Sequence, residues 1–432
     1  MKRLFIFIIA SLIFSLILEK EGGAIPAFAR KYRTSCTTCH VVFPKLNDFG
    51  EAFRANGFQI PQDDEIYVKD EPVSLGAEEW KMMWPYSVWP GEFPHLPPIA
   101  FLTRFAIKQR EKGDVKGDFT FPETFLFLVG GTLGRDISFF GHIGEGRRVY
   151  IQFNNLFDNK IPRYALNLRI GLFEPGVVAF SNERRLTVVQ NLFSTFNLEF
   201  ANGNANNFQF DRQSGFEIDG VLFSRFKYLF GLTNGSGDSP DNNSKKDFYY
   251  RTAFKLWGMG FDGAGAELEE SLKQTENWQD NSITVGHFGY FGANTASDVA
   301  GLGRKYNIDF IRLGVDFRIN YQDLDLVGAY LWGDDENPAN DGFDVGSSLF
   351  FCEANYVFFP WLVGALRFED LNFKGPNSED LNEIKKFIVS ATVSIRANLK
   401  VVVDGEFVDG SRIRKGEDNS RDAFLARLDF AF

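Results

Sequence analysis

The last residues of the chain, RDAFLARLDFAF (421–432), alternate between apolar and other side chains. Successive side chains of a β-strand point to opposite faces, so one face carries Phe424, Ala426, Leu428, Phe430 and Phe432. A strand that faces lipid needs this alternation, and a strand that ends in Phe is what outer-membrane assembly recognises. The stretch therefore predicts the closing strand of an outer-membrane β-barrel.

The same texture extends upstream to Pro98. Alternating runs include residues 99–109, 251–261, 310–321 and 386–408. Tight turns are expected at 320–323, 359–361 and 396–398, and longer polar loops at 234–247, 333–344, 373–383 and 410–422. Short turns that alternate with long loops are typical of outer-membrane barrels, whose strand number is even. A soluble β-sandwich would show fewer apolar positions per strand and less systematic loops. We expect an all-β, antiparallel barrel of about 16 strands, although the long acidic segment 262–280 falls where a short turn is due.

The N-terminus has the features of an export signal. Lys2 and Arg3 precede an apolar run from Leu4 to Leu18, and Gly22-Gly23-Ala24 offers the small residues that signal peptidase requires. The run is short for a membrane helix, which needs about 20 apolar residues. We predict a signal peptide at 1–24, with a retained anchor as the alternative. The remaining domains are then 25–97, a plug with its connector, and 98–432, a barrel with both termini periplasmic.

Two of the three cysteines stand in TSCTTCH (34–40), which contains the C-x-x-C-H pattern of c-type haem attachment. Cys36 and Cys39 would add across the two vinyl groups of the porphyrin, and His40 would supply an axial nitrogen to the iron. A structural zinc site usually needs four ligands, and no second cysteine pair is present. The same two cysteines could instead form a thioredoxin-like redox pair or a plain Cys36–Cys39 disulfide. Because c-type haem is attached outside the cytoplasm, the predicted export signal agrees with a haem site. We therefore predict one covalently attached c-type haem.

The residues after the motif predict a short helix. Asn47 or Asp48 caps its start and Asn56-Gly57 marks its end. Phe49 and Phe53, four residues apart, share one face of that helix. Together with Phe28 and Phe43 they are predicted to pack against the haem, because about 70 residues are few for an independent core. The plug domain is therefore expected to be small, helical and irregular.

The second axial ligand has several candidates. His95 lies in a Pro-rich connector before the barrel, and Met82 and Met83 are the nearest thioethers. A Met ligand would raise the reduction potential. A site with no second protein ligand is a further alternative. His142 and His287 lie in strand-like runs and are interpreted as ordinary strand residues.

The bulk composition limits the partners. The formal net charge is −11, so no basic surface is available for the phosphates of nucleic acid. The sequence has no P-loop, H-E-x-x-H or G-x-S-x-G motif. The partner expected from the barrel itself is outer-membrane lipid.

The N-terminal region resembles the fused monohaem cytochrome–porins of the bacterial outer membrane. In that family a Pro-x-Phe-Ala-Arg stretch precedes the haem motif, as residues 26–30 do here, and Phe-Pro-x-Leu-Asn-x-Phe-Gly follows it, as residues 43–50 do. The resemblance covers about 40 residues, with barrel architecture and size beyond them. It implies a haem domain that plugs a barrel and passes electrons through the outer membrane. The iron-oxidising members usually read Ala-Arg-Gln-Thr-Gly where this chain reads Ala29-Arg30-Lys31-Tyr32-Arg33, so the resemblance implies the family and leaves the donor open.

Three hypotheses for the function follow. The first is an electron-transfer protein that takes electrons from an extracellular donor, with ferrous iron as one candidate, and delivers them to periplasmic cytochromes. The second is a transport porin whose haem plug is a gate or a folding nucleus. The third is an outward conduit to an extracellular acceptor. An Fe(II) oxidase activity would follow only from the first.

Overall fold

The computed structural model describes most of the barrel and the core of the N-terminal domain. The described residues are 27–62, 64–69, 73–74, 82, 92–93, 99–111, 116–144, 146–195, 198–199, 205–206, 210, 212–241, 243–266, 280–297, 305–376, 383–410 and 422–431. The predicted signal peptide, His95, Met83 and Phe432 lie outside these ranges.

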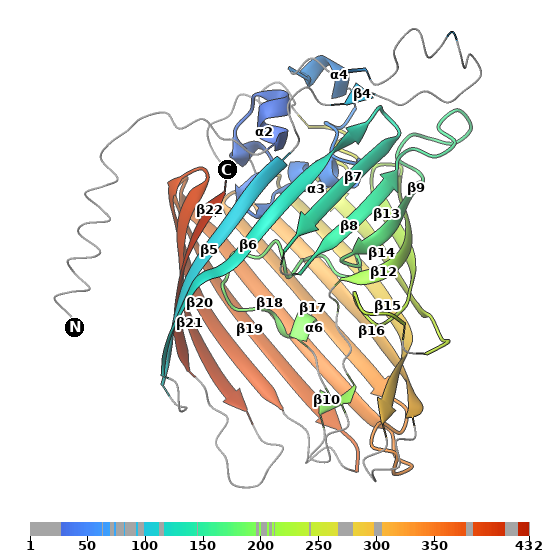
Figure 1. The fold of residues 1–432 in the computed structure, drawn as a ribbon, viewed down its shortest axis with the longest axis vertical. Coiled ribbons are helices and arrows are strands. Elements are labelled where there is room, and N and C mark those ends of the chain that lie inside the picture. Colours follow the sequence, from blue (N-terminus) through green and yellow to red (C-terminus); the bar gives the residue numbers. More distant parts are fainter. Residues whose placement is uncertain are drawn as a thin grey trace, which may run out of the picture.

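Sixteen antiparallel strands close into a barrel, in which β22 pairs with β5 and β9 pairs with β12 (Figure 1). The predicted barrel of about 16 strands is confirmed. The strands are β5 Ile99–Arg110, β6 Gly117–Leu133, β7 Ile137–Ile143, β8 Arg148–Phe153, β9 Asn167–Phe173, β12 Gln213–Leu222, β13 Phe226–Thr233, β14 Asp247–Trp257, β15 Ser282–Ser297, β16 Lys305–Tyr321, β17 Leu324–Asp335, β18 Val345–Phe359, β19 Leu362–Lys374, β20 Ile384–Arg396, β21 Leu399–Gly410 and β22 Ala423–Ala431.

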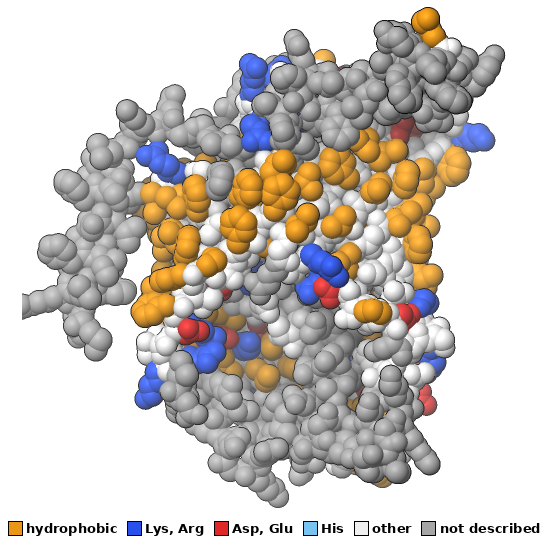
Figure 2. Space-filling model, viewed as in Figure 1, with side chains coloured by type: hydrophobic (Ala, Val, Ile, Leu, Met, Phe, Trp, Pro, Cys, Tyr) orange, Lys and Arg blue, Asp and Glu red, His pale blue; other side chains and the backbone are white. Residues whose placement is uncertain are grey.

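The alternation of β22 is the one that the sequence predicts. Phe424, Leu428 and Phe430 are exposed on the outer face, whereas Arg427 and Asp429 are buried on the inner face and pair at 2.6 Å. Figure 2 shows outward hydrophobic side chains spread across the visible face of the barrel wall. A barrel wall that is apolar outside and charged inside is what a membrane-spanning strand requires.

The tight turns lie where the sequence places them. β16 and β17, β18 and β19, and β20 and β21 are each joined by two residues. These turns lie at the same barrel end as the start of β5 and the end of β22 (Figure 1). The exceptional segment 262–280 also begins at this end, and Gln62 Nε2 donates to the Gly263 carbonyl at 3.3 Å. Its described part therefore packs on the N-terminal domain, which accounts for a long connection where a tight turn is due.

The N-terminal domain sits in this end of the barrel as a plug (Figure 1). Its elements are α2 Ala27–Tyr32, the 3₁₀ turn η1 Cys36–Thr38, β1 His40–Val42, β2 Lys45–Leu46, α3 Asp48–Ala55 and α4 Asp64–Tyr67. The predicted helix is confirmed: Asn47 caps α3 by accepting from Gly50 N at 2.8 Å, and the helix ends before Asn56-Gly57. None of the helices in the described part of the chain is long and apolar enough to span a membrane.

Buried ion pairs dock the plug on the barrel wall. Asp48 Oδ2 lies 2.9 Å from Lys255 Nζ on β14, and Lys45 Nζ lies 3.2 Å from Asp325 Oδ2 on β17. Arg318 of β16 adds a 2.9 Å hydrogen bond to the Leu46 carbonyl. Paired charges in a low-dielectric site hold a fixed geometry, because separating them leaves each charge desolvated and alone.

The chain that connects β9 to β12 folds into the barrel lumen. We call residues 174–195 the in-folded segment. Its amides bind inward carboxylates on the strands opposite: Val188 N and Val189 N donate to Asp404 at 2.6 and 3.0 Å, and Leu192 N donates to Glu369 at 2.6 Å. The short helix α6 (Leu192–Thr195) lies inside the barrel (Figure 1).

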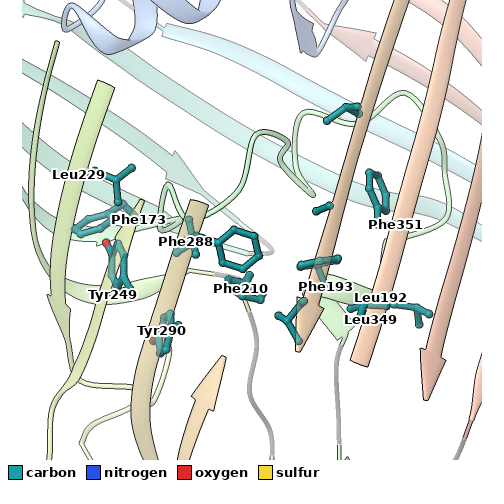
Figure 3. Close-up of a cluster of buried hydrophobic side chains, with 14 of the residues drawn as sticks. Phe173, Leu192, Phe193, Phe210, Leu229, Tyr249, Phe288, Tyr290, Leu349 and Phe351 are labelled. Carbon is teal, nitrogen blue, oxygen red and sulfur yellow. The ribbon is translucent and has the colours of Figure 1, made fainter. Parts of the chain in front are cut away.

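Aromatic side chains pack around the in-folded segment. Figure 3 shows Phe193 and Phe210 between Phe288 of β15 and Phe351 of β18. All four are at most 5% exposed, and the Phe193–Phe210 ring centroids are 5.6 Å apart. An apolar cluster thus lies inside the barrel, where the in-folded segment meets the wall. Three small ribbons complete the described elements: β3 Val73–Ser74 with β4 Glu92–Phe93, β10 Leu198–Glu199 with β11 Ala205–Asn206, and β1 with β2.

Candidate haem site

A cavity of about 280 Å³ lies between the plug and barrel strands β5 to β9. We call it the plug–barrel cavity. Cys36, Cys39 and His40 all line it, on the plug side. Its volume is near the lower end of ligand pockets, which run from roughly 300 to 1,000 Å³. The haem motif therefore opens into a cavity between plug and barrel wall and not onto the outer surface of the barrel.

The motif is held by the residues that follow it. Asn47 Nδ2 donates to the carbonyls of Thr37 and Thr38 at 3.3 and 3.0 Å, and Asn47 N donates to the Cys39 carbonyl at 3.1 Å. One asparagine thus caps α3 and clamps the turn that carries both thiols.

Gly50 brings the same helix against the motif. A Cβ added at Gly50 would lie 2.0 Å from the Cys39 carbonyl oxygen, closer than atoms can approach. Glycine is required here because the backbones touch. The Asn-x-x-Gly spacing therefore has a local structural reason.

The cysteines are free thiols. Burial raises the pKa of Cys36, and burial together with Cys36 raises the pKa of Cys39 to about 12. The described residues contain no cluster of three or more His, Cys, Asp or Glu side chains that converge on a metal position.

His40 is poised as a neutral ligand. Burial lowers its pKa to about 4, against a smaller opposite effect of the Pro44 and Lys45 carbonyls. The imidazole is therefore neutral at pH 7, the state in which a ring nitrogen can bind a metal. Its Nδ1 is buried without a hydrogen-bond partner among the described residues.

The four phenylalanines predicted to pack against the haem all line the plug–barrel cavity: Phe28, Phe43, Phe49 and Phe53. Phe28 stacks on Phe58 with ring centroids 5.0 Å apart, and Phe43 meets the His40 ring edge-on at 5.3 Å. An apolar lining of this kind excludes water from a bound macrocycle.

The predicted second ligands are not brought to the cavity by the described structure. Met82 is 78% exposed, while His95 and Met83 lie outside the described residues, so these candidates stay predictions. His287 is exposed on the outer face of β15, where its ring stacks on Tyr250. His142, which the sequence presents as an ordinary strand residue, lines the same cavity as His40.

Arginines complete the cavity lining. Arg54 comes from α3, Arg104 from β5, Arg148 from β8 and Arg184 from the in-folded segment. Guanidinium groups pair with carboxylates in a planar, two-pronged geometry, so they suit the two propionates of a haem. Only Arg54 lies close to the haem motif in the sequence. The alternation of side chains along β5 and β8 indicates that Arg104 and Arg148 point into the barrel. Which inward side chains face the plug depends on how the plug docks.

The donor set thus fits a c-type haem. Cys36 and Cys39 offer two thiols for thioether bonds to a porphyrin, and His40 is the adjacent neutral nitrogen. The cavity adds an apolar lining and cationic side chains.

Comparisons with known proteins bear on the barrel. No family model and no curated protein matches the chain. Among solved structures, the outer-membrane protein OmpT of Vibrio cholerae in its trimer form is 10% identical with a TM-score of 0.51, over 77% of this chain and 98% of that one. The outer-membrane channel DcaP of Acinetobacter baumannii is 9% identical (TM-score 0.49; 77% and 96%), and an anion-selective porin from Comamonas acidovorans is 11% identical (TM-score 0.48; 77% and 98%). At these identities the likeness concerns the fold alone: the chain has a porin-like β-barrel.

Proposed function

We propose that this protein is an outer-membrane electron-transfer protein that carries one c-type haem in its plug. The observation that carries the proposal is the position of Cys36, Cys39 and His40 on a cavity that plug and barrel wall close together. The hydrophobic side chains on the outer barrel face and the predicted export signal support the location.

Each group of residues has a task in this proposal. Cys36 and Cys39 hold the haem covalently, His40 binds its iron, and Asn47 fixes the turn that carries all three. When bound, the haem supplies a one-electron redox centre whose potential depends on its ligands and on solvent exclusion. The phenylalanine lining keeps water out, and the arginines stabilise the propionate charges.

The plug and the in-folded segment inside the lumen favour transfer of electrons over transfer of solute. The plug fills one end of the barrel, and the in-folded segment buries Phe193 and Phe351 across its middle. An extracellular donor such as ferrous iron would then deliver electrons without entering the cell, and a periplasmic cytochrome c would accept them. One haem takes one electron, which matches the oxidation of one ferrous ion.

A transport porin is the second candidate, and the likeness of the barrel to porins favours it. In that function the plug is a gate or a folding nucleus. Solute would need the plug or the in-folded segment to move, since both occupy the lumen.

The test uses full-length protein purified from membranes, with Cys39→Ala as the control. Haem staining on a denaturing gel shows whether attachment is covalent. The protein is then placed in vesicles that enclose cytochrome c, and ferrous iron is added outside without oxygen. Reduction of the trapped cytochrome by wild type and not by Cys39→Ala supports the conduit. Solute uptake with no such reduction supports the porin, and wild-type protein without covalent haem refutes the proposal.

A further inference from the structure

His142 occupies an inward position of β7. Strand parity places Ser138, Phe140 and His142 on one face, and Ile143, 55% exposed, on the other. Phe140 continues the aromatic packing of the plug, since its ring centroid lies 5.8 Å from that of Phe58. The barrel wall thus presents a histidine at the place where plug and barrel meet.

One ring nitrogen of His142 has no hydrogen-bond partner among the described residues. The residue is 5% exposed, and this nitrogen, Nε2, is buried. A buried polar atom without a partner costs about 1–3 kcal/mol, so a native structure that keeps one calls for an explanation. Histidine is the commonest metal ligand among side chains, which makes a bound metal the natural partner.

Charged residues line the same cavity as His142. Among them are Arg104, Arg148 and Glu183, whose carboxylate pairs with Arg148 at 3.2 Å. His40 lines the same cavity from the plug side. One histidine from the plug and one from the barrel wall therefore line the same largely apolar cavity.

We propose that His142 is the second axial ligand of the haem, bound through Nε2 and supplied by the barrel wall. The inference rests on the proposed function, because it needs the haem attached at Cys36 and Cys39. The new bond uses the imidazole lone pair and changes no oxidation state. It has a structural consequence: two-histidine ligation forms only when the plug is docked in a closed barrel, so the haem itself fastens plug to wall.

The test compares His142→Ala with His287→Ala in full-length, haem-loaded protein. Optical and electron paramagnetic resonance spectra report whether the ferric iron is low-spin, as two strong axial ligands make it. We expect His142→Ala to lose the low-spin signal and added imidazole to restore it, while His287→Ala keeps the wild-type spectrum. His142→Met is expected to stay low-spin with a raised potential, because a thioether ligand favours the reduced iron.

A measurement on wild type guards against a variant that fails to fold. On heating in detergent, the loss of the low-spin spectrum should coincide with the loss of β-sheet circular dichroism from the barrel. Low-spin haem that persists in the unfolded barrel, or in folded His142→Ala without imidazole, overturns the inference and points to His95, Met82 or Met83. Wild type without covalent haem refutes the proposed function instead.

Discussion

The docking of the plug depends on Asp48, and its removal gives a quantitative test. Asp48 is 8% exposed, and its Oδ2 accepts from Lys255 Nζ at 2.9 Å and from Ser282 Oγ at 2.8 Å. Arg318 Nη1 lies 3.7 Å from Oδ1. Burial by itself raises the pKa of Asp48, but Lys255 and Arg318 outweigh it and hold the pKa below its ordinary value. Asp48→Asn keeps the shape of the side chain and removes the charge.

The expected loss of docking free energy depends on which carboxylates Lys255 and Arg318 still contact after the substitution. Breaking a buried pair by removal of one partner costs about 3–5 kcal/mol. Lys255 keeps Asp280 at 3.3 Å and Arg318 keeps Asp325 at 3.1 Å, so the lower end applies. About 3 kcal/mol corresponds to a roughly 100-fold larger undocked fraction, since each 1.4 kcal/mol is tenfold.

Native-state proteolysis measures that fraction. Thermolysin cleavage beside Phe49 and Phe53, both at most 4% exposed, requires the plug to leave the barrel, and its rate follows the open population when reclosing is fast. The matched control is Asp309→Asn, which breaks an exposed pair with Lys245 worth about 0–1 kcal/mol. Equal cleavage rates for Asp48→Asn and wild type would refute the docking argument.

Four further predictions concern the plug and the lumen. Asn47→Ala should lower the haem-to-protein absorbance ratio, and Asn47→Asp, which keeps the helix cap but not the donor to the motif, should recover only the helix signal in circular dichroism. Gly50→Ala should abolish haem attachment, measured by haem staining, because its Cβ meets the Cys39 carbonyl at 2.0 Å; Gly405→Ala, whose nearest neighbour is 3.5 Å away, should attach haem normally. Arg367→Met should raise conductance in planar bilayers, since Arg367 binds the in-folded segment through the Val189 carbonyl at 2.8 Å; an unchanged conductance would mean that the segment is held elsewhere. Docking should be complete above the ordinary carboxyl pKa of about 4 and weaken as pH falls through the lowered pKa of Asp48, and proteolysis of Asp48→Asn should lack this acid step.

The sequence determined the local features and the class of fold. The alternation in residues 421–432 fixed which face of β22 meets lipid, because strand periodicity is a property of the backbone. The tight turns at 320–323, 359–361 and 396–398, the helix that begins at Asp48, and the haem motif with its four phenylalanines were all readable, since each depends on residues close in the chain.

Tertiary structure alone decided what meets across the barrel. Closure brings β22 beside β5 and carries Asp404 and Glu369 to the in-folded segment. The last two contacts join residues 216 and 177 positions apart, so no local sequence pattern predicts them. The same closure places His142 on the cavity of His40. Strand parity tells that His142 points inward, but a barrel has many inward positions. Only the docked plug selects the one that faces the haem motif.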